Sequence, residues 1–361
     1  MKLNPINIIH AIVVWQSLLF AIVLLTPKFY KLKSNTFLSL LLFTLALQFF
    51  YNLLYTNGYY AELLSPYSYC YGLLYGPFIF FYVRFHLFND AKFKTIDWFH
   101  FSPFFLYLIF TFLGYRPYRV MDDFLLPIML IYCVLSFKTI YSYNTTLPYV
   151  SAKNKSSQAK WLYSIVFLMF AITLFNLLQF YVNRVRLLGI EVSLEVFVQL
   201  SVLLWINLIL YNAIKNPQTF QQLSYQDFEI GKFTMSKRNL NKNQKSDLEK
   251  VAEKIEHHMM TENPYLNPDL SISDFSNAIG IHPKLLSQAI NNVIGYNFCD
   301  YVNSYRIRLA KEKLKKNSKE TLSIKEVMYD TGFNSRSVFN TAFKSKTGIT
   351  PSEYRKKHGK F

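Results

Sequence analysis

The stretch Ser323–Arg355, SIKEVMYDTGFNSRSVFNTAFKSKTGITPSEYR, decides how the carboxyl-terminal part of this chain folds. Its first serine and Glu326 have the spacing of a capping box, so a helix is predicted to begin at about Ile324. Gly332 can adopt the positive φ that ends this helix, and Ser335 can cap a second one. Two short helices joined by such a turn have the spacing of a helix-turn-helix unit.

The second predicted helix has one apolar face and one polar face. Val338, Phe339, Ala342 and Phe343 recur at helical spacing and form an inward stripe. The outward side chains are short donors and cations, which suit the base edges of a DNA major groove. They are Arg336, Ser337, Asn340, Thr341 and Lys344.

Several residues of this region occur together at fixed spacing: Gly332-Phe333, Phe339, Phe343-Lys344, Gly348, Thr350-Pro351 and Tyr354-Arg355. Their joint pattern resembles the signature of the AraC family of bacterial transcription regulators. Members of that family carry two helix-turn-helix units joined by a long helix, so the resemblance implies a first unit upstream. It covers residues 265–361.

The preceding sequence has the signals that a first unit needs. Ser271 and Asp274 give a second capping pattern, Gly280 can end a short helix, and Pro283 fits the first position of the next one. Residues 298–316 then form an uninterrupted helical pattern that ends in lysines. We therefore predict a first helix-turn-helix unit followed by a linker helix.

Three residues depart from the family pattern. Met328 stands where an alanine is usual, and Ser276 occupies the corresponding place in the first unit. Methionine needs room between helices that normally touch. His282 replaces the usual serine or threonine cap and is expected to weaken that helix start.

The resemblance also implies which side chains meet DNA. Base-reading positions fall on Lys284, Ser287 and Gln288 in the first unit and on Arg336, Ser337 and Thr341 in the second. Phosphate contacts are expected from Asn340, Lys344, Lys346 and Arg355. Arginine pairs bidentately with guanine, and glutamine with adenine. Arg336 and Gln288 are therefore expected to discriminate most between sequences.

Composition allows two kinds of anionic partner. The chain holds 39 Lys and Arg against 22 Asp and Glu, yet 52% of its residues are hydrophobic, so its basic balance fits both anionic lipid and nucleic acid. Cys70, Cys133 and Cys299 lie far apart, with neither disulfide nor zinc-site spacing. The sequence has no nucleotide-binding loop and no paired catalytic constellation. We therefore predict no enzyme activity, no metal and no cofactor.

Residues 1–215 contain seven apolar runs that we interpret as transmembrane helices. About 20 apolar residues in a helix span the hydrocarbon layer of roughly 30 Å. Charged residues shorten the uncharged cores of the third and fifth runs. The runs are Ile6–Leu25, Phe37–Tyr55, Tyr67–Phe85, Trp98–Tyr115, Phe124–Tyr141, Trp161–Val182 and Val196–Ile214.

The loops between these runs carry unequal charge. Residues 27–35, 84–97 and 138–160 hold ten Lys or Arg, whereas the alternate loops hold four. Cations favour the cytoplasmic side of a membrane. The amino terminus is therefore predicted to lie outside a bacterial inner membrane, with the carboxyl-terminal domain in the cytoplasm.

Polar residues inside these runs allow two interpretations. They either form hydrogen bonds between helices or converge on a pocket for a signal. The only acidic residue near a span interior is Glu195, which argues against ion-coupled transport. The polar residues are Gln16, Gln48, Asn52, Asn176, Gln179, Gln199 and Asn207.

Two segments connect the predicted membrane part to the predicted regulator domain. Residues 216–246 are predicted to be a polar juxtamembrane linker, with its cations on anionic headgroups or in solvent. Residues 247–262 repeat apolar side chains at helical spacing, so they predict an amphipathic coupling helix. That helix is expected to pack on the regulator domain or on its copy in a second chain.

The sequence thus predicts an all-α protein, with a seven-helix transmembrane bundle in residues 1–215 and a soluble AraC-like domain in residues 263–361. The favoured function is a membrane-bound transcription regulator that couples a signal to promoter binding. Expected partners are double-stranded DNA, membrane lipid, a second copy of the chain, an unknown small-molecule or membrane signal, and RNA polymerase if the protein is an activator. The alternatives are a receptor or transporter whose helical tail binds a protein, and an integral membrane enzyme.

Overall fold

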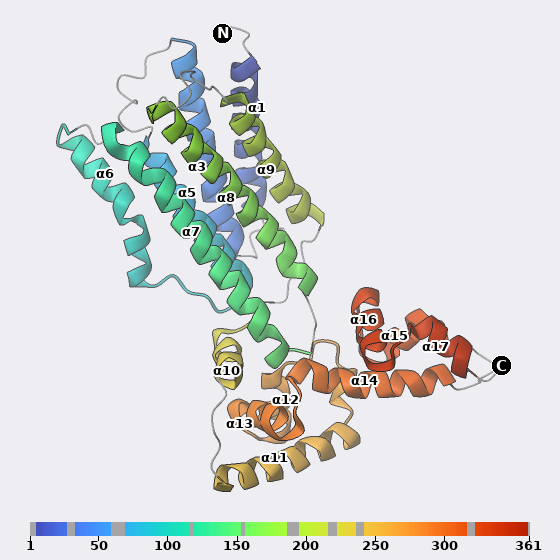
Figure 1. The fold of residues 1–361 in the computed structure, drawn as a ribbon. Coiled ribbons are helices and arrows are strands. Elements are labelled where there is room, and N and C mark those ends of the chain that lie inside the picture. Colours follow the sequence, from blue (N-terminus) through green and yellow to red (C-terminus); the bar gives the residue numbers. More distant parts are fainter. Residues whose placement is uncertain are drawn as a thin grey trace. The chain divides into compact units, whose positions relative to one another are not determined.

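The computed structural model describes residues 5–26, 33–58, 69–115, 118–152, 156–185, 195–215, 222–235, 242–315 and 322–359. Within these ranges the regular elements are all helices, which confirms the all-α prediction there (Figure 1). The chain divides into two compact units. Unit 1 comprises residues 1–141 and 157–222, and unit 2 comprises residues 142–156 and 223–361.

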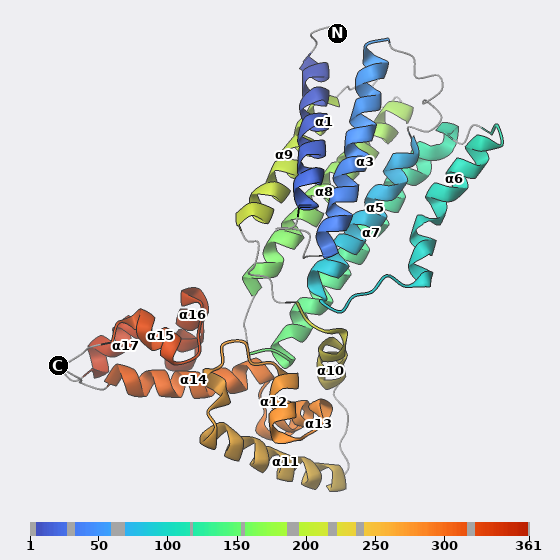
Figure 2. The ribbon, with the colours of Figure 1, turned by 180° about the vertical axis from the view of Figure 1, so that it is seen from behind.

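Unit 1 is built from apolar helices, of which α1 and α3 pack along each other in both views (Figures 1 and 2). Two 3₁₀ turns, η1 (Tyr69–Tyr71) and η2 (Thr95–Phe101), precede α5 and α6. The last turn of α7 and the 3₁₀ turn η3 (Leu147–Tyr149) belong to unit 2. The helices are α1 (Pro5–Leu24), α3 (Lys33–Thr56), α5 (Gly72–Leu87), α6 (Ser102–Phe112), α7 (Tyr118–Thr146), α8 (Ser156–Val185) and α9 (Glu195–Lys215).

The predicted count of seven spans is wrong for the described residues, because only four helical stretches there are long and apolar enough to cross a membrane. They are Pro5–Leu24, Lys33–Thr56, Asp123–Tyr149 and Lys160–Val182. α5 has 16 residues and α6 has 11, which gives lengths of about 24 and 17 Å. The run predicted over Trp98–Tyr115 starts inside the 3₁₀ turn η2, so its α-helical part is short. α9 contributes the shorter apolar segment Val196–Ile209.

Arg84, which shortened the third predicted span, is paired at the end of α5. Its Nη1 donates to Asp97 Oδ1 at 2.9 Å. The other oxygen of that carboxylate accepts from the Lys94 backbone N–H at 2.8 Å and so helps to start η2. The ion pair therefore joins the end of α5 to the beginning of η2.

Helix α1 turns several polar side chains inward and large apolar ones outward. α1 buries Asn7, His10 and Ser17, whereas Trp15 is 76% exposed and Ile22 is 65% exposed. A water-soluble helix has the opposite arrangement. This polarity suits surroundings that are themselves apolar.

The polar residues singled out in the sequence bond within or between helices where their contacts are known. Asn207 Nδ2 donates to Gln16 Oε1 at 3.2 Å, which joins α9 to α1. Gln48 donates to Asn52 at 3.3 Å along α3, and Asn176 donates to the Ile172 carbonyl at 2.9 Å along α8. These bonds favour the hydrogen-bonding interpretation over a convergent pocket.

Unit 2 contains the predicted helix-turn-helix region and one helix that was not predicted. α10 (Tyr225–Met235) lies in the segment expected to be a plain linker. Other elements are α11 (Lys242–Thr261), η4 (Pro264–Leu266), α12 (Ile272–Ile279), α13 (Pro283–Ala289), the π-helical turn η5 (Ile290–Ile294), α14 (Phe298–Lys315), α15 (Ile324–Asp330), α16 (Arg336–Thr347) and α17 (Pro351–His358).

The amphipathic helix α11 packs inside its own chain. Its apolar side chains Leu248, Ala252, Ile255 and Met259 are buried, and the helix contacts α12, α13 and η5. Of the two contacts left open by the sequence, packing on the regulator domain is the one observed.

Residues 142–152 form part of unit 2 although they are far from it in sequence. The Ala152 N–H donates to the Leu270 carbonyl at 3.1 Å, and the Ile272 N–H donates to the Val150 carbonyl at 2.9 Å. These two bonds flank an isolated antiparallel bridge between Ser151 and Ser271. The segment after α7 is thereby fixed to the start of α12.

Candidate nucleic-acid interface

The first helix of the second helix-turn-helix unit, α15, begins as predicted. The Ser323 hydroxyl accepts from the Glu326 N–H at 3.1 Å, and the Glu326 carboxylate accepts from the Ser323 N–H at 2.6 Å. These bonds lower the pKa of Glu326, so the cap keeps its charge at neutral pH. α15 consequently starts at Ile324.

Gly332 is required at the turn between α15 and α16 for two reasons. Its φ is +83°, a left-handed conformation that side-chain-bearing residues rarely adopt. A Cβ at this position would also lie 2.5 Å from the Tyr265 carbonyl oxygen. The turn can therefore approach η4 only because residue 332 has no side chain.

Ser335 occupies the cap position of α16 but makes no side-chain capping bond. Its Oγ lies 3.4 Å from Ser337 Oγ instead. The predicted helix start is correct and the predicted cap bond is not formed. α16 is held by packing rather than by its cap.

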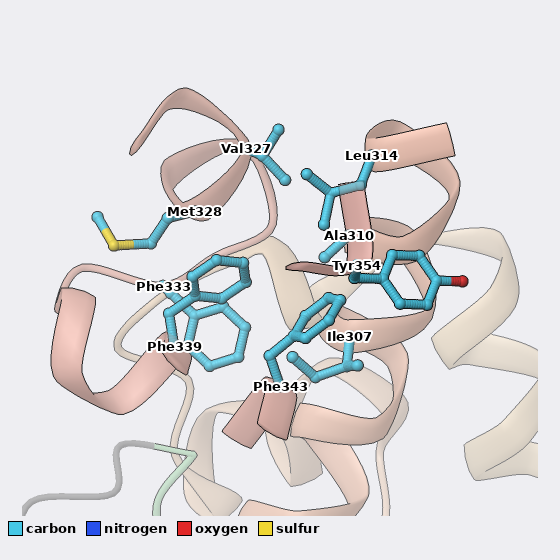
Figure 3. Close-up of a cluster of buried hydrophobic side chains, with 9 residues drawn as sticks. All are labelled: Ile307, Ala310, Leu314, Val327, Met328, Phe333, Phe339, Phe343 and Tyr354. Atoms are coloured by element: carbon cyan, nitrogen blue, oxygen red, sulfur yellow. The ribbon is translucent and has the colours of Figure 1, made fainter. Parts of the chain in front are cut away.

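An apolar cluster positions α16 against the linker helix. Figure 3 shows the rings of Phe333, Phe339 and Phe343 at the middle of this cluster, with Met328 at its edge. The ring centroids of Phe333 and Phe339 are 5.2 Å apart, and those of Phe339 and Phe343 are 5.7 Å apart. α14 contributes further side chains from its buried face. The cluster comprises Ile307, Ala310, Leu314, Val327, Met328, Phe333, Phe339, Phe343 and Tyr354.

Met328, the departure from the family pattern, is accommodated. Its side chain is 3% exposed and belongs to the buried cluster. Ser276, at the corresponding place in the first unit, is also buried and donates to the Ser273 carbonyl at 2.9 Å. Neither residue leaves its helix pair unpacked.

The polar face of α16 is open. Arg336, Ser337, Thr341 and Lys344 are exposed, and Asn340 is half-buried. Lys346 is exposed as well, with its Nζ 4.6 Å from the centre of the Tyr296 ring in the first unit. Arg355, the last predicted phosphate contact, is half-buried on α17.

The helices of the first helix-turn-helix unit also begin where the sequence predicts. Ser271 and Asp274 form a capping box, and Gly280 ends α12 with φ +66°. His282 was expected to be a weaker cap than serine or threonine. It nevertheless caps α13, since its Nδ1 accepts a hydrogen bond from the Lys284 N–H at 3.3 Å. Pro283 follows at the first position of α13.

The three base-reading positions predicted in the first helix-turn-helix unit are not equally accessible. Lys284 is exposed and Gln288 is half-buried, whereas Ser287 is 3% exposed. The Ser287 hydroxyl lies 2.7 Å from the hydroxyl of Thr234, which is on α10. The unpredicted helix therefore lies against the face that the resemblance assigns to DNA.

A sequence signal for α10 was present. Ser224 and Asp227 have capping-box spacing, and the Asp227 N–H donates to Ser224 Oγ at 3.0 Å. Phe228 and Ile230 then provide buried apolar contacts. The polar and cationic residues around this short helix concealed the pattern.

Arg306 on α14 joins three segments of unit 2. Its guanidinium donates to the carbonyls of Tyr265 at 2.7 Å, Asn267 at 2.7 Å and Ala152 at 3.3 Å. Burial lowers the pKa of Arg306 to about 10, which is still far enough above neutral pH to keep the group charged. The side chain therefore ties the linker helix to η4 and to the segment after α7.

Cys299 lies near the same junction. Burial raises the pKa of its thiol to about 12, so the group is neutral. The thiol donates to the Ala152 carbonyl at 3.6 Å and accepts from Asn303 Nδ2 at 3.3 Å. No group of His, Cys, Asp or Glu that could hold a metal lies in the described part of the chain.

Comparison with known proteins places this geometry in a known class. Residues 275–357 match the family model described as "Helix-turn-helix domain". The transcriptional activator RhrA of Rhizobium meliloti (strain 1021) is 34% identical over 98 residues, which cover 27% of this chain and 31% of RhrA. The transcriptional regulatory protein YesN of Bacillus subtilis (strain 168) is 30% identical over 95 residues, which cover 26% of this chain and 25% of YesN. No solved structure matches the chain with significance.

The similarity to these relatives is limited to one region of the chain. The chain spans less than a third of the length of either protein. The HTH-type transcriptional regulator YtdP of Bacillus subtilis (strain 168) matches over 87 residues, at 28% identity. The carboxyl-terminal region of this chain is therefore a helix-turn-helix domain similar to those of DNA-binding transcription regulators, which supports its resemblance to the AraC family.

Proposed function

We propose that the chain is a membrane-bound, sequence-specific DNA-binding regulator of transcription that couples a signal at the membrane to promoter binding. The observation that carries this proposal is the exposed polar face of α16, which is presented by a buried aromatic cluster within a helix-turn-helix domain. Short donors and cations on such a helix fit the major groove. Unit 1 would serve as the membrane-bound sensor and residues 263–361 as the DNA-binding domain.

The proposed residue roles are those that the resemblance to the AraC family implies. Arg336, Ser337 and Thr341 would read bases in the second unit, as would Lys284, Ser287 and Gln288 in the first. Lys344, Lys346, Arg355 and Asn340 would bind phosphates and set the position of the protein on the duplex. α14 has 18 residues and is about 27 Å long, close to the roughly 34 Å between successive major-groove faces.

Four helical stretches of membrane-spanning length and the buried polar side chains of α1 support the membrane part of the proposal. α5 and α6 follow each other in the chain. If both cross the membrane, or if neither does, α7 begins on the same side of the membrane. The carboxyl-terminal domain lies in the cytoplasm if α9 also crosses. The loop cations favour this orientation, with the amino terminus outside a bacterial inner membrane.

The orientation can be tested with reporter fusions. Reporters that are active only outside the cytoplasm should be active after Gly58 and after Tyr118, and inactive after Asn154 and at the carboxyl terminus. These sites keep their expected sides whether or not α5 and α6 cross. An active fusion at the carboxyl terminus would place the helix-turn-helix domain away from DNA and contradict the proposal.

The DNA contacts can be tested on the whole chain in lipid nanodiscs. A fragment that starts at Ser246 would lack α10 and the Ala152 carbonyl that Arg306 uses, so it is a poorer test object. Duplexes selected from a random library would serve as specific DNA, with scrambled duplexes for comparison. Affinities would be measured across a salt series.

We expect Arg336→Ala to weaken binding to the selected duplex by about 1–3 kcal/mol and to have much less effect on scrambled DNA, because a bidentate arginine–guanine pair is lost. Lys344→Ala is the matched control. It should weaken both duplexes alike and reduce the salt slope by about one unit. Equal weakening of both duplexes by Arg336→Ala, with a reduced salt slope, would make Arg336 a phosphate contact.

The partners proposed beyond DNA are membrane lipid, a second copy of the chain, a small-molecule or membrane signal and, for an activator, RNA polymerase. The alternative is a receptor or transporter whose tail binds a protein. Met328 departs from the family pattern, but its side chain is buried in the apolar cluster, so packing is no objection to a working helix-turn-helix unit.

A further inference from the structure

α10 covers the first recognition helix. Thr234 and Ser287 place their hydroxyl oxygens 2.7 Å apart, and Asn291 Nδ2 donates to the Thr234 carbonyl at 3.4 Å. One turn before Ser287, the Lys284 Nζ lies 5.2 Å from the centre of the Phe233 ring. These contacts, all within unit 2, engage α13 on the side where DNA would bind.

The two recognition helices therefore differ in access. On α16 Arg336, Ser337 and Thr341 are exposed, whereas on α13 Ser287 is buried beneath α10. A side chain reads a base only by direct or water-bridged contact in the groove. In the observed conformation the reading face of the second helix-turn-helix unit is exposed, whereas that of the first is partly covered at Ser287.

The remaining contacts of α10 hold it on both sides. Asp227 accepts a hydrogen bond from the Ser273 hydroxyl of α12. On the opposite side Gly231 packs so closely that a Cβ there would lie 2.4 Å from Thr146 Cγ2 and 3.0 Å from Val150 Cγ1. α10 is thus held between the first helix-turn-helix unit and the segment that follows α7.

The polar contacts that α10 makes with α13 are weak enough to be exchanged. The hydroxyl pair and the amide–carbonyl bond each add little net stability, because both replace equally good bonds to water. Contacts of this size permit opening at a modest energy. They also permit DNA to compete for the same face.

Unit 1 ends at Gln222, shortly before α10 in the sequence. Gln222 Nε2 donates to the carbonyls of Phe85 at 3.1 Å and His86 at 3.2 Å, at the end of α5. Three residues later α10 begins at Tyr225. Only residues 223 and 224 separate unit 1 from α10 along the chain.

We infer that α10 is an autoinhibitory cover, which competes with double-stranded DNA for the reading face of α13. While α10 is in place, the protein binds DNA through the second helix-turn-helix unit alone. Displacement of α10 frees the first helix-turn-helix unit and lets both helix-turn-helix units bind one duplex. This inference rests on the proposed DNA-binding function.

The test is a reversible lock on the whole chain in nanodiscs. Thr234→Cys combined with Ser287→Cys places two thiols where the hydroxyls are 2.7 Å apart, a separation from which a disulfide can close. The oxidised and reduced forms of this one protein differ only in whether α10 can leave α13. The controls are the two variants that carry only one of these substitutions, treated with the same oxidant.

Oxidation is expected to weaken binding to the selected duplex at least about tenfold, because a locked cover removes the competent state. It should also shorten the footprint from two groove segments to one. Reduction should restore both the affinity and the footprint, and neither variant with only one of the two substitutions should respond to oxidant. In a separate variant, Phe233→Ala with Thr234→Ala should bind the selected duplex more tightly, because these residues hold the cover and are not assigned to DNA.

The possible results separate the two levels of the argument. Equal affinity and equal footprint for the locked and reduced forms would overturn the cover and leave the proposed function intact. Failure of the wild-type protein and of the double-alanine variant to bind any duplex would overturn the proposed function itself, and the cover with it.

Discussion

Arg306→Met is expected to lower the free energy of unfolding of unit 2 by about 3–5 kcal/mol, because three buried carbonyls lose a charged donor at once. Arg306 is 2% exposed and donates to Tyr265, Asn267 and Ala152. Methionine fills part of the space and replaces none of these bonds. The loss of stability should extend to the segment after α7 and to η4, since both supply carbonyl oxygens that accept hydrogen bonds from Arg306.

Hydrogen exchange measured by mass spectrometry on the nanodisc-embedded protein would check this expectation. Amides of α12 and α14 should exchange roughly 100-fold to 3,000-fold faster, which is the same energy expressed as a ratio. Arg308→Met is the matched control, because Arg308 is exposed on the same helix. Similar exchange in the two variants would mean that Arg306 does not hold unit 2 together.

Phe339→Ala is expected to destabilise the second helix-turn-helix unit by about 3–5 kcal/mol, through lost apolar burial and the cavity left behind. Phe339 is fully buried, and its ring lies between those of Phe333 and Phe343. α16 makes no side-chain cap bond, so packing is its main restraint. DNA binding through α16 should be lost together with this packing.

The same exchange measurement would localise the effect. Amides of α15, α16 and α17 should lose protection, while those of α11 to α13 should change little. Tyr329→Ala is the control, because Tyr329 is 53% exposed and surface substitutions of this kind change stability by about 0.5 kcal/mol or less. Uniform loss across unit 2 would show that its two helix-turn-helix units unfold as one.

Features fixed by neighbouring residues could be predicted from the sequence. The capping boxes at Ser271 and Ser323 and the left-handed glycines at Gly280 and Gly332 occur as expected. Each depends on atoms within about one helical turn, so local chemistry decides it. The linker helix likewise ends within a residue of its predicted limit.

Features that depend on distant partners could not be predicted. The buried charge of Arg306 requires carbonyls from residues about 40 and 150 positions away. A charged residue in a lysine-rich helix otherwise indicates a solvated face. The burial of Ser287 depends in the same way on Thr234, which lies in a segment that reads as a polar linker.

The number of membrane-length helices was overestimated because hydropathy does not distinguish helix types. Trp98 and Phe99 extend an apolar run, yet they lie in the 3₁₀ turn η2. Asp97 starts that turn through its bonds to Lys94 and Arg84. A charged pair at the end of an apolar run thus shortened the α-helix that follows.

The most direct test is the ratio of two affinities, measured on the wild-type chain in lipid nanodiscs at physiological salt. One duplex would carry the sequence selected by the protein from a random library, and the other the same bases in scrambled order. A regulator that reads DNA through Arg336 and its neighbours should prefer the selected duplex by about 10³ or more. Equal affinity for the two duplexes would contradict sequence-specific binding and leave unit 2 without the proposed function.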